Sequence, residues 1–209
     1  MIQSRQILKY QNKNLIEKVV IQPPFRYNPV FQDSGCFLYA KGNTPKLLSS
    51  EVNIKLKDKE AVLLKCGAYV TDWLQTANSP TEIIVVHLLP DILKQLYSNE
   101  LPKVFKQRKA TKQVKVIVPD DMMKRFIESL EFYFHNPQIV NEDLLELKLK
   151  ELILLLVQSR NAASVLELIE DLYYSQNVNF KNVIELHKYE NLSISELASL
   201  CGLSLSSFK

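Results

Sequence analysis

The sequence has few of the residues that catalytic and metal-binding sites use. Its three cysteines, Cys36, Cys66 and Cys201, form neither a CxxC pair nor a Cys/His ligand pattern, and only three histidines are present. Protein metal sites bring three or four ligands together, so no metal is expected. The four glycines form no phosphate-binding loop or dinucleotide fingerprint, and no Gly-x-Ser-x-Gly motif occurs. These absences predict a protein that is not an enzyme and carries no cofactor.

The sequence also lacks a long apolar segment. Its longest uninterrupted apolar run, residues 152–157, is far too short to span a bilayer, and the first residues contain no signal-peptide core. The formal charge of +3 is too small to predict nucleic-acid binding by itself. The hydrophobic fraction of 46% and the charged fraction of 23% are typical of a soluble globular protein. We therefore expect a cytoplasmic protein without membrane contact.

Short segments with strand-like patterns fill the first half of the chain. Residues 52–57 alternate apolar and polar side chains, which indicates a strand with one buried face. The other expected strands are residues 17–22, 35–42, 60–66, 69–74 and 82–89. Several short strands at close spacing are typical of a β-sandwich or barrel.

From about residue 91 the apolar spacing becomes helical. The expected helices are residues 91–98, 119–136, 142–157, 162–174 and 180–189. The helix at 142–157 is apolar on more than one side, and both sides must be buried. One side can cover the sheet, while the other needs either the 162–174 helix or another subunit. The candidate dimerisation residues on this helix are Leu145, Leu149, Leu152, Ile153 and Leu156.

The end of the chain has the pattern of a helix-turn-helix. Ser193 and Glu196 are spaced as a capping box, and Gly202 stands where a helix must end with a positive φ. Ala198, four residues before that glycine, lets a second helix pack closely across the first, while Ser204 can cap the second helix. An ordinary antiparallel helix pair would share these caps, but their combination favours a DNA-binding unit.

At these residues a family resemblance becomes specific. Residues 191–209 closely resemble the first helix-turn-helix of AraC-type bacterial transcription regulators, and residues 180–189 are similar to the helix that opens that domain. By position in the family, Ser206 and Lys209 look like base-facing residues, and Phe208 looks like a core residue. The chain stops inside the second helix, so we expect DNA binding only from the full-length protein, because base readout needs the whole helix in the groove.

The family's domain order implies an α+β protein with three parts. These are a cupin-like β-barrel sensor with a basic connector at residues 1–118, a helical dimerisation region at 119–176, and a truncated DNA-binding domain at 177–209. The resemblance implies DNA, a second copy in a homodimer, and an unknown small-molecule or protein effector as partners.

Ligand binding in the sensor would draw on aromatic side chains, which often line barrel pockets but more often pack in a core. The candidates are Tyr27, Phe31, Tyr39, Tyr69 and Trp73. His87, the only histidine of the β region, is expected to be a core or rim residue.

Two further questions stay open at this point. A basic run between Leu101 and Val118 is either a solvated connector or a contact for DNA phosphates. The alternative to a regulator is a cupin-like small-molecule-binding or enzymatic module with no role in DNA binding.

Overall fold

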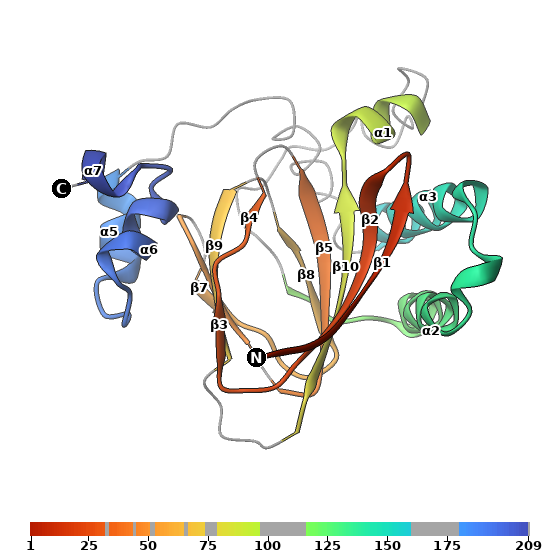
Figure 1. Ribbon diagram of the computed structural model, residues 1–209, viewed down its shortest axis with the longest axis horizontal. Coiled ribbons are helices and arrows are strands. Elements are labelled where there is room, and N and C mark those ends of the chain that lie inside the picture. The colour runs from red at the N-terminus through yellow and green to blue at the C-terminus, as the bar shows by residue number, and fades with distance from the viewer. Residues whose placement is uncertain are drawn as a thin grey trace.

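Two antiparallel sheets lie between two groups of helices, which gives the molecule four layers (Figure 1). The computed structural model describes residues 1–31, 34–43, 45–50, 53–64, 67–73, 79–96, 116–159 and 180–208. The expected helix at 162–174 and most of the basic run lie outside these residues.

The first sheet is built around a long N-terminal hairpin. Gln11 and Asn12 connect its two strands, and both have a positive φ, of 48° and 62°, which is the geometry of a tight two-residue turn. Every strand pairing in this sheet is antiparallel. Its strands, in spatial order, are β1 (Ile2–Tyr10), β2 (Lys13–Ile21), β10 (Thr81–Leu88), β5 (Gly35–Lys41), β8 (Glu60–Leu64) and β11 (Val116–Ile117).

The second sheet is smaller and faces the first. Its strands are β3 (Phe25–Tyr27), β9 (Gly67–Trp73), β6 (Lys46–Ser49) and β7 (Asn53–Lys55) in spatial order, with β4 (Val30–Phe31) pairing with β9. Among the described strands, no pairing joins this sheet to the first. The expected barrel is therefore observed as two facing sheets whose edges are not closed by strand pairing.

Strand β5 lies at the centre of the first sheet and is buried on both faces. Cys36, Leu38 and Ala40 point to the core between the two sheets, whereas Phe37 and Tyr39 point to the helices on the other side. Because side chains alternate along a strand, β5 needs apolar residues at successive positions. This explains the unbroken apolar sequence of the strand.

Helices cover the outer face of the first sheet. They are α1 (Pro90–Leu96), α2 (Asp121–His135), the 3₁₀ turn η2 (Pro137–Ile139) and α3 (Glu142–Gln158). The side chains of Asp120 and Asn141 cap α2 and α3 by accepting hydrogen bonds of 2.9 Å from backbone amides three residues on. Between these helices and the sheet lies an extended apolar core, to which α2 contributes Met123, Phe126, Ile127, Leu130 and Phe134.

The last three helices cover the outer face of the second sheet. They are α5 (Phe180–His187), α6 (Ile194–Leu200) and α7 (Leu205–Phe208), and they lie on the opposite side of the molecule from α2 and α3 (Figure 1). The sheet contributes Leu48 of β6 and its cross-strand partner Val70 of β9 to this contact. The helices contribute Val183, Leu200 and Cys201. We call residues 180–208 the helical unit.

Candidate functional site

Helix α6 has the expected caps at both of its ends. The amide of Ser193 donates to Glu196 Oε2 over 2.7 Å, and the amide of Glu196 donates to Ser193 Oγ over 3.3 Å, so the capping box is complete. At the other end Gly202 has a φ of +67°, and its amide and that of Leu203 return to Ser199 and Ala198. This pair of bonds is a Schellman motif, which ends the helix sharply.

The turn directs α7 across α6 in the manner of a helix-turn-helix. Ala198 is 1% exposed, as a close helix crossing requires, and the Ser207 amide donates to Ser204 Oγ over 3.2 Å at the start of α7. Ser206, the predicted base-facing residue, is exposed, whereas Phe208 packs against the cluster beneath. Lys209 lies outside the described residues. The geometry thus leaves Ser206, the described residue of the predicted reading face, open to solvent.

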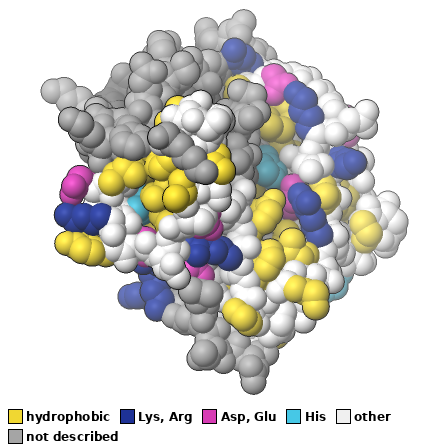
Figure 2. Space-filling model, turned by 60° about the vertical axis from the view of Figure 1, so that its left-hand side comes forward, with side chains coloured by type: hydrophobic (Ala, Val, Ile, Leu, Met, Phe, Trp, Pro, Cys, Tyr) yellow, Lys and Arg dark blue, Asp and Glu magenta, His cyan; other side chains and the backbone are white. Residues whose placement is uncertain are grey.

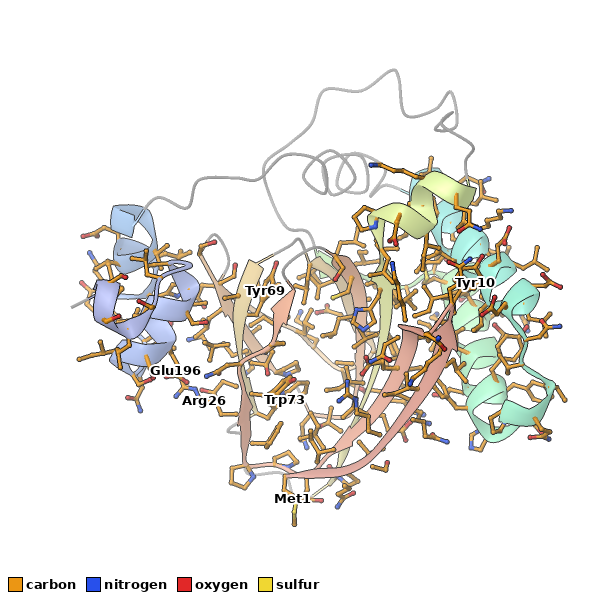
Figure 3. The ribbon with its side chains drawn as sticks, turned by 45° about the horizontal axis from the view of Figure 1, so that its top comes forward. Met1, Tyr10, Arg26, Tyr69, Trp73 and Glu196 are labelled. Carbon is orange, nitrogen blue, oxygen red and sulfur yellow. The ribbon has the colours of Figure 1, made fainter. Side chains whose placement is uncertain are left out.

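Charged side chains attach the helical unit to the second sheet. Arg26 Nε of β3 lies 2.8 Å from Glu196 Oε1 of α6, and Lys46 of β6 forms an ion pair with Glu190. Asn53 Nδ2 also donates to Glu190, over 3.0 Å. Figure 3 shows Arg26 and Glu196 facing one another between the sheet and the helices. The contact is therefore ionic around a small apolar centre.

Three carboxylates in this contact have shifted pKa values. Burial alone would raise the pKa of Glu196, but hydrogen bonds from Ser193 and the charge of Arg26 lower it. The hydrogen bond from Lys46 lowers the pKa of Glu190. Burial raises the pKa of Asp72 on β9, and the negative charges of Glu196 and Glu190 raise it further against the opposing cations. Asp72 is thus the carboxylate that this contact stabilises least.

The outward side of the helical unit carries exposed apolar residues. Tyr189 is 90% exposed, and Figure 2 shows hydrophobic side chains among charged ones on this face. The others are Leu186, Ile194, Leu203 and Leu205.

The five predicted dimerisation residues of α3 are all buried inside the chain. Each is at most 2% exposed and packs in the core that α2 and α3 share with the first sheet: Leu145, Leu149, Leu152, Ile153 and Leu156. A side chain already buried by its own chain has no surface left for a second subunit. The exposed apolar residues of this helix lie on its other side, where Leu147 is 60% and Leu154 is 49% exposed.

The five aromatic ligand candidates do not line one common space. Tyr69 and Trp73 of β9 both point into the core between the sheets (Figure 3). Tyr39 points the other way, toward the helices on the first sheet. Tyr27 is 49% exposed and stacks on Phe25, while the side chain of Phe31 lies outside the description. Only Tyr69 and Trp73 remain as a pair that could face a ligand held between the sheets.

A partly buried ionic cluster lies on the inter-sheet side of the first sheet. Glu17 of β2 accepts bonds of 2.7 and 2.9 Å from the Arg5 guanidinium, and its Oε1 lies 3.1 Å from His87 Nε2. Burial would raise the pKa of Glu17, but the bonds with His87 and Arg5 lower it below its ordinary value. His87 is thus a half-buried partner of a carboxylate, in agreement with the expected core or rim position.

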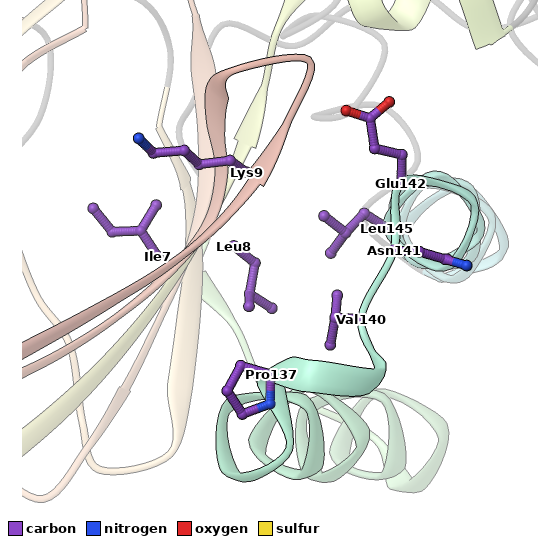
Figure 4. A pocket seen from close by; sticks show the side chains of 8 residues that line it. All are labelled: Ile7, Leu8, Lys9, Pro137, Val140, Asn141, Glu142 and Leu145. Carbon is purple, nitrogen blue, oxygen red and sulfur yellow. The ribbon is translucent and has the colours of Figure 1, made fainter.

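An open groove of about 260 Å³ runs between strand β1 and the start of α3. Figure 4 shows Ile7, Leu8 and Lys9 on one side of it and the η2–α3 segment on the other. Over the described ranges, no three His, Cys, Asp or Glu side chains converge as a metal site would require. None of the described helices is long and apolar enough to cross a membrane.

The middle of the chain matches a known protein family. Residues 40–168 match the family described as the ExsA N-terminal regulatory domain, which covers more than half of the chain. The chain belongs to this family. It is the regulatory part of an AraC-type transcription regulator, as the resemblance of residues 191–209 implied. This family consists of non-enzymatic regulators.

Solved structures of the regulator ToxT from Vibrio cholerae share the fold. The structure of wild-type ToxT from strain SCE256 with a bound unsaturated fatty acid has a TM-score of 0.51 and 13% identity, over 93% of this chain and 88% of that one. ToxT from strain O395 bound to (E)-4-(8-methylnaphthalen-1-yl)but-3-enoic acid has a TM-score of 0.50 and 13% identity, over 93% and 92%.

A cupin-2 domain protein from Shewanella frigidimarina is a much weaker match, with a TM-score of 0.32 and 12% identity over 42% of this chain and 82% of that one, and does not decide the fold. No curated protein sequence matches the chain.

Sequence reasoning missed the residues that join the helical unit to the sheet. Arg26, Lys46 and Asp72 stand on short strands, and their partners Glu190 and Glu196 lie far away along the chain. A single charged residue on a strand gives no sign of such a partner. The one local signal was Glu196 itself, whose capping role was recognised but whose second contact was not.

Proposed function

We propose that this chain senses a signal and pairs subunits for a DNA-binding transcription regulator. Under this proposal, residues 1–118 are a cupin-like sensor, 119–176 a dimerisation region and 177–209 the start of the DNA-binding domain. The observation that carries the proposal is the capped helix-turn-helix of α6 and α7, whose outward Ser206 remains exposed while the unit is held on a regulatory domain.

DNA contact is proposed to run through Ser206 and Lys209. In the intact regulator, Ser206→Ala and Lys209→Ala should each cost about 1–3 kcal/mol of discrimination at one base position if they face base edges. Selection from a random duplex library measures this. If the regulator enriches no duplex sequence from the library, that result would support the alternative of a binding module with no DNA role.

Pairing of two copies is proposed to use the outward side of α3. Leu144, Leu147 and Leu154 recur at spacings of three and seven residues, as the apolar residues of a two-helix contact do, with Glu151 at the intervening position. Leu147→Glu should shift sedimentation of the chain from dimer to monomer, because the charge would have to be buried in the seam. Tyr189→Glu, at a more exposed apolar position on the far side of the molecule, is the control. A wild-type chain that stays monomeric at high concentration would contradict this interface.

The effector is proposed to act on the core between the two sheets, either as a small ligand or through a protein partner. The ToxT structure with its unsaturated fatty acid supports an apolar ligand for a fold of this kind. Trp73 is the only tryptophan and is 2% exposed between the sheets, so its fluorescence reports directly on that core. A saturable change on titration with a long-chain unsaturated fatty acid would support ligand sensing. No change in emission or thermal stability would favour a protein effector.

A further inference from the structure

Arg26 lies beside two carboxylates that belong to different parts of the fold. Asp72 is its direct cross-strand partner, since β3 and β9 pair Arg26 with Asp72. Glu196 belongs to α6 of the helical unit, and its Oε1 lies 2.8 Å from Arg26 Nε. Opposite charges at directly paired positions of an antiparallel sheet ordinarily attract one another. Here Arg26 forms its ion pair with Glu196 of α6 instead of with Asp72.

This choice leaves two buried polar atoms unsatisfied. Arg26 Nε and Asp72 Oδ1 are both buried and have no hydrogen-bond partner within the described part of the chain. The contact of Arg26 Nε with Glu196 is thus an ion pair without a well-directed hydrogen bond. A buried polar atom without a partner costs the protein its lost hydration. The contact between the helical unit and the second sheet therefore has an energetic cost, the lost hydration of Asp72 Oδ1.

The second cation beside Asp72 is used in the same way. Lys46 of β6 is the cross-strand partner of Asp72 on its other side, and it forms an ion pair with Glu190 of the helical unit. Asp72 thus lies between two cations, and both of them bind carboxylates of the helical unit, Glu196 and Glu190. His187 of α5 also approaches this region and bonds to the carbonyl of Ser49.

We propose that Arg26, Lys46, Asp72, Glu190 and Glu196 form a reversible clasp between the second sheet and the helical unit. In the docked state the two cations bind Glu196 and Glu190. In the undocked state they bind Asp72, which regains its partners within the sheet. The clasp would let the regulator change how its DNA-reading helix is presented without unfolding either part, whatever the nature of the effector.

The apolar part of the contact is small enough for such a clasp to decide the equilibrium. The sheet offers only Leu48 and Val70 to the shared cluster, among the residues that the structure describes. Interfaces of this mixed polar kind between parts of one chain resemble transient protein–protein contacts. Ser206 stays exposed in the docked state, so docking does not cover this residue of α7.

Strand β9 connects the clasp to the core between the sheets, because it contributes residues to both. Its Tyr69 and Trp73 point into that core, while Val70 and Asp72 point outward to the helical unit. Alternation along one strand therefore places the two surfaces back to back. A shift of β9 caused on the inner side would move Asp72 relative to both cations.

Cysteine labelling can test the clasp in the full chain. Cys201 is 7% exposed in the cluster under the helical unit, and Cys36 is 0% exposed between the sheets. In a Cys66→Ser background, the Cys201 labelling rate reports undocking, and the Cys36 rate reports global unfolding. Glu196→Gln removes the charge that Arg26 binds but retains a residue that serves in a capping box. We expect Cys201 to label about tenfold faster in this variant, with Cys36 unchanged.

We expect Asp72→Asn to change the Cys201 labelling rate in the opposite direction. Removing the competing carboxylate should slow Cys201 labelling, an effect that simple loss of structure does not produce. Lys150→Gln, which breaks a comparable ion pair with Glu146 on α3, should change neither rate. The clasp is ruled out if Glu196→Gln leaves the Cys201 rate unchanged or if Asp72→Asn increases it. A fall in helix content of Glu196→Gln, seen by circular dichroism, would assign faster labelling to unfolding of α6 and would also rule it out.

Discussion

The two groups of helices are attached to their sheets by different forces. On the first sheet, α2 and α3 bury five apolar side chains each in one continuous core. On the second sheet, the apolar contact of the helical unit is with Leu48 and Val70 among the described strand residues. Ion pairs from Arg26 and Lys46 and hydrogen bonds with Asn53 and the Ser49 carbonyl complete it. The first contact is thus an extensive apolar core, whereas the second is small and largely ionic, as the proposed clasp requires.

The largest expected effect is in the first contact. Leu149 is 0% exposed within the core of α3, so Leu149→Ala should reduce the free energy of unfolding by about 3 kcal/mol through lost burial and a new cavity. Denaturant unfolding measures this. Gln158→Ala, at an exposed position of the same helix outside the proposed pairing surface, should stay within about 0.5 kcal/mol of the wild type. Equal losses in the two variants would mean that α3 does not pack as described.

Leu48→Ala should have a smaller effect, confined to the second contact. Leu48 is 1% exposed beneath the helical unit, and its truncation removes about 2 kcal/mol of apolar contact there. Hydrogen exchange should show faster exchange in α5 and α6, with α3 unaffected. Uniform acceleration along the whole chain would show instead that both contacts belong to one cooperative unit.

Ser193→Ala tests the helical unit without touching the sheet. Loss of the capping oxygen should cost α6 about 1 kcal/mol. Ser199→Ala, at a half-buried serine near the other end of the same helix, is the control. Exchange rates of the α6 amides give the comparison, and equal rates in both variants would remove the capping box as a source of stability.

The smallest expected effects are two pH dependences of opposite sign. The folded pKa of Glu17 lies below its ordinary value of 4.5, so its stabilisation is complete above that value and is lost as the pH falls through the folded pKa. The folded pKa of Asp72 lies above its ordinary value of 3.8, so its ionisation removes stability as the pH rises through the folded pKa.

Unfolding free energies measured from pH 3 to 7 should separate the two carboxylates. At pH 7 Glu17→Gln should be destabilising and Asp72→Asn stabilising, and both effects should shrink toward pH 3. A stabilising effect of Asp72→Asn that is equally large at both ends of this range would contradict the electrostatic origin.

Local features of the fold could be predicted from the sequence, whereas contacts between distant segments could not. The caps of α2, α3 and α6 are local and could be predicted because serine, asparagine and aspartate act within three residues of their own position. Strand β1 was not predicted, since it is an edge strand whose exposed positions, such as Ser4 and Gln6, dilute the apolar alternation.

The sequence also does not show which layer of the fold each apolar or charged side chain faces. The apolar side of α3 that contains Leu149 could be recognised, but periodicity does not say which side meets the sheet and which meets solvent. Likewise, Tyr39 and Tyr69 both look like pocket residues until the register of β5 and β9 assigns them to different layers. The partner of Arg26 depends on a contact between segments at opposite ends of the chain.

Native-state hydrogen exchange at low and high salt tests the contrast between the two contacts most directly. The account predicts that amides of α3 exchange only through global unfolding, while amides of α5 and α6 exchange through a smaller opening that salt makes easier by weakening the ion pairs of Arg26 and Lys46. A single opening free energy shared by α3, α5 and α6, with no dependence on salt, would contradict it.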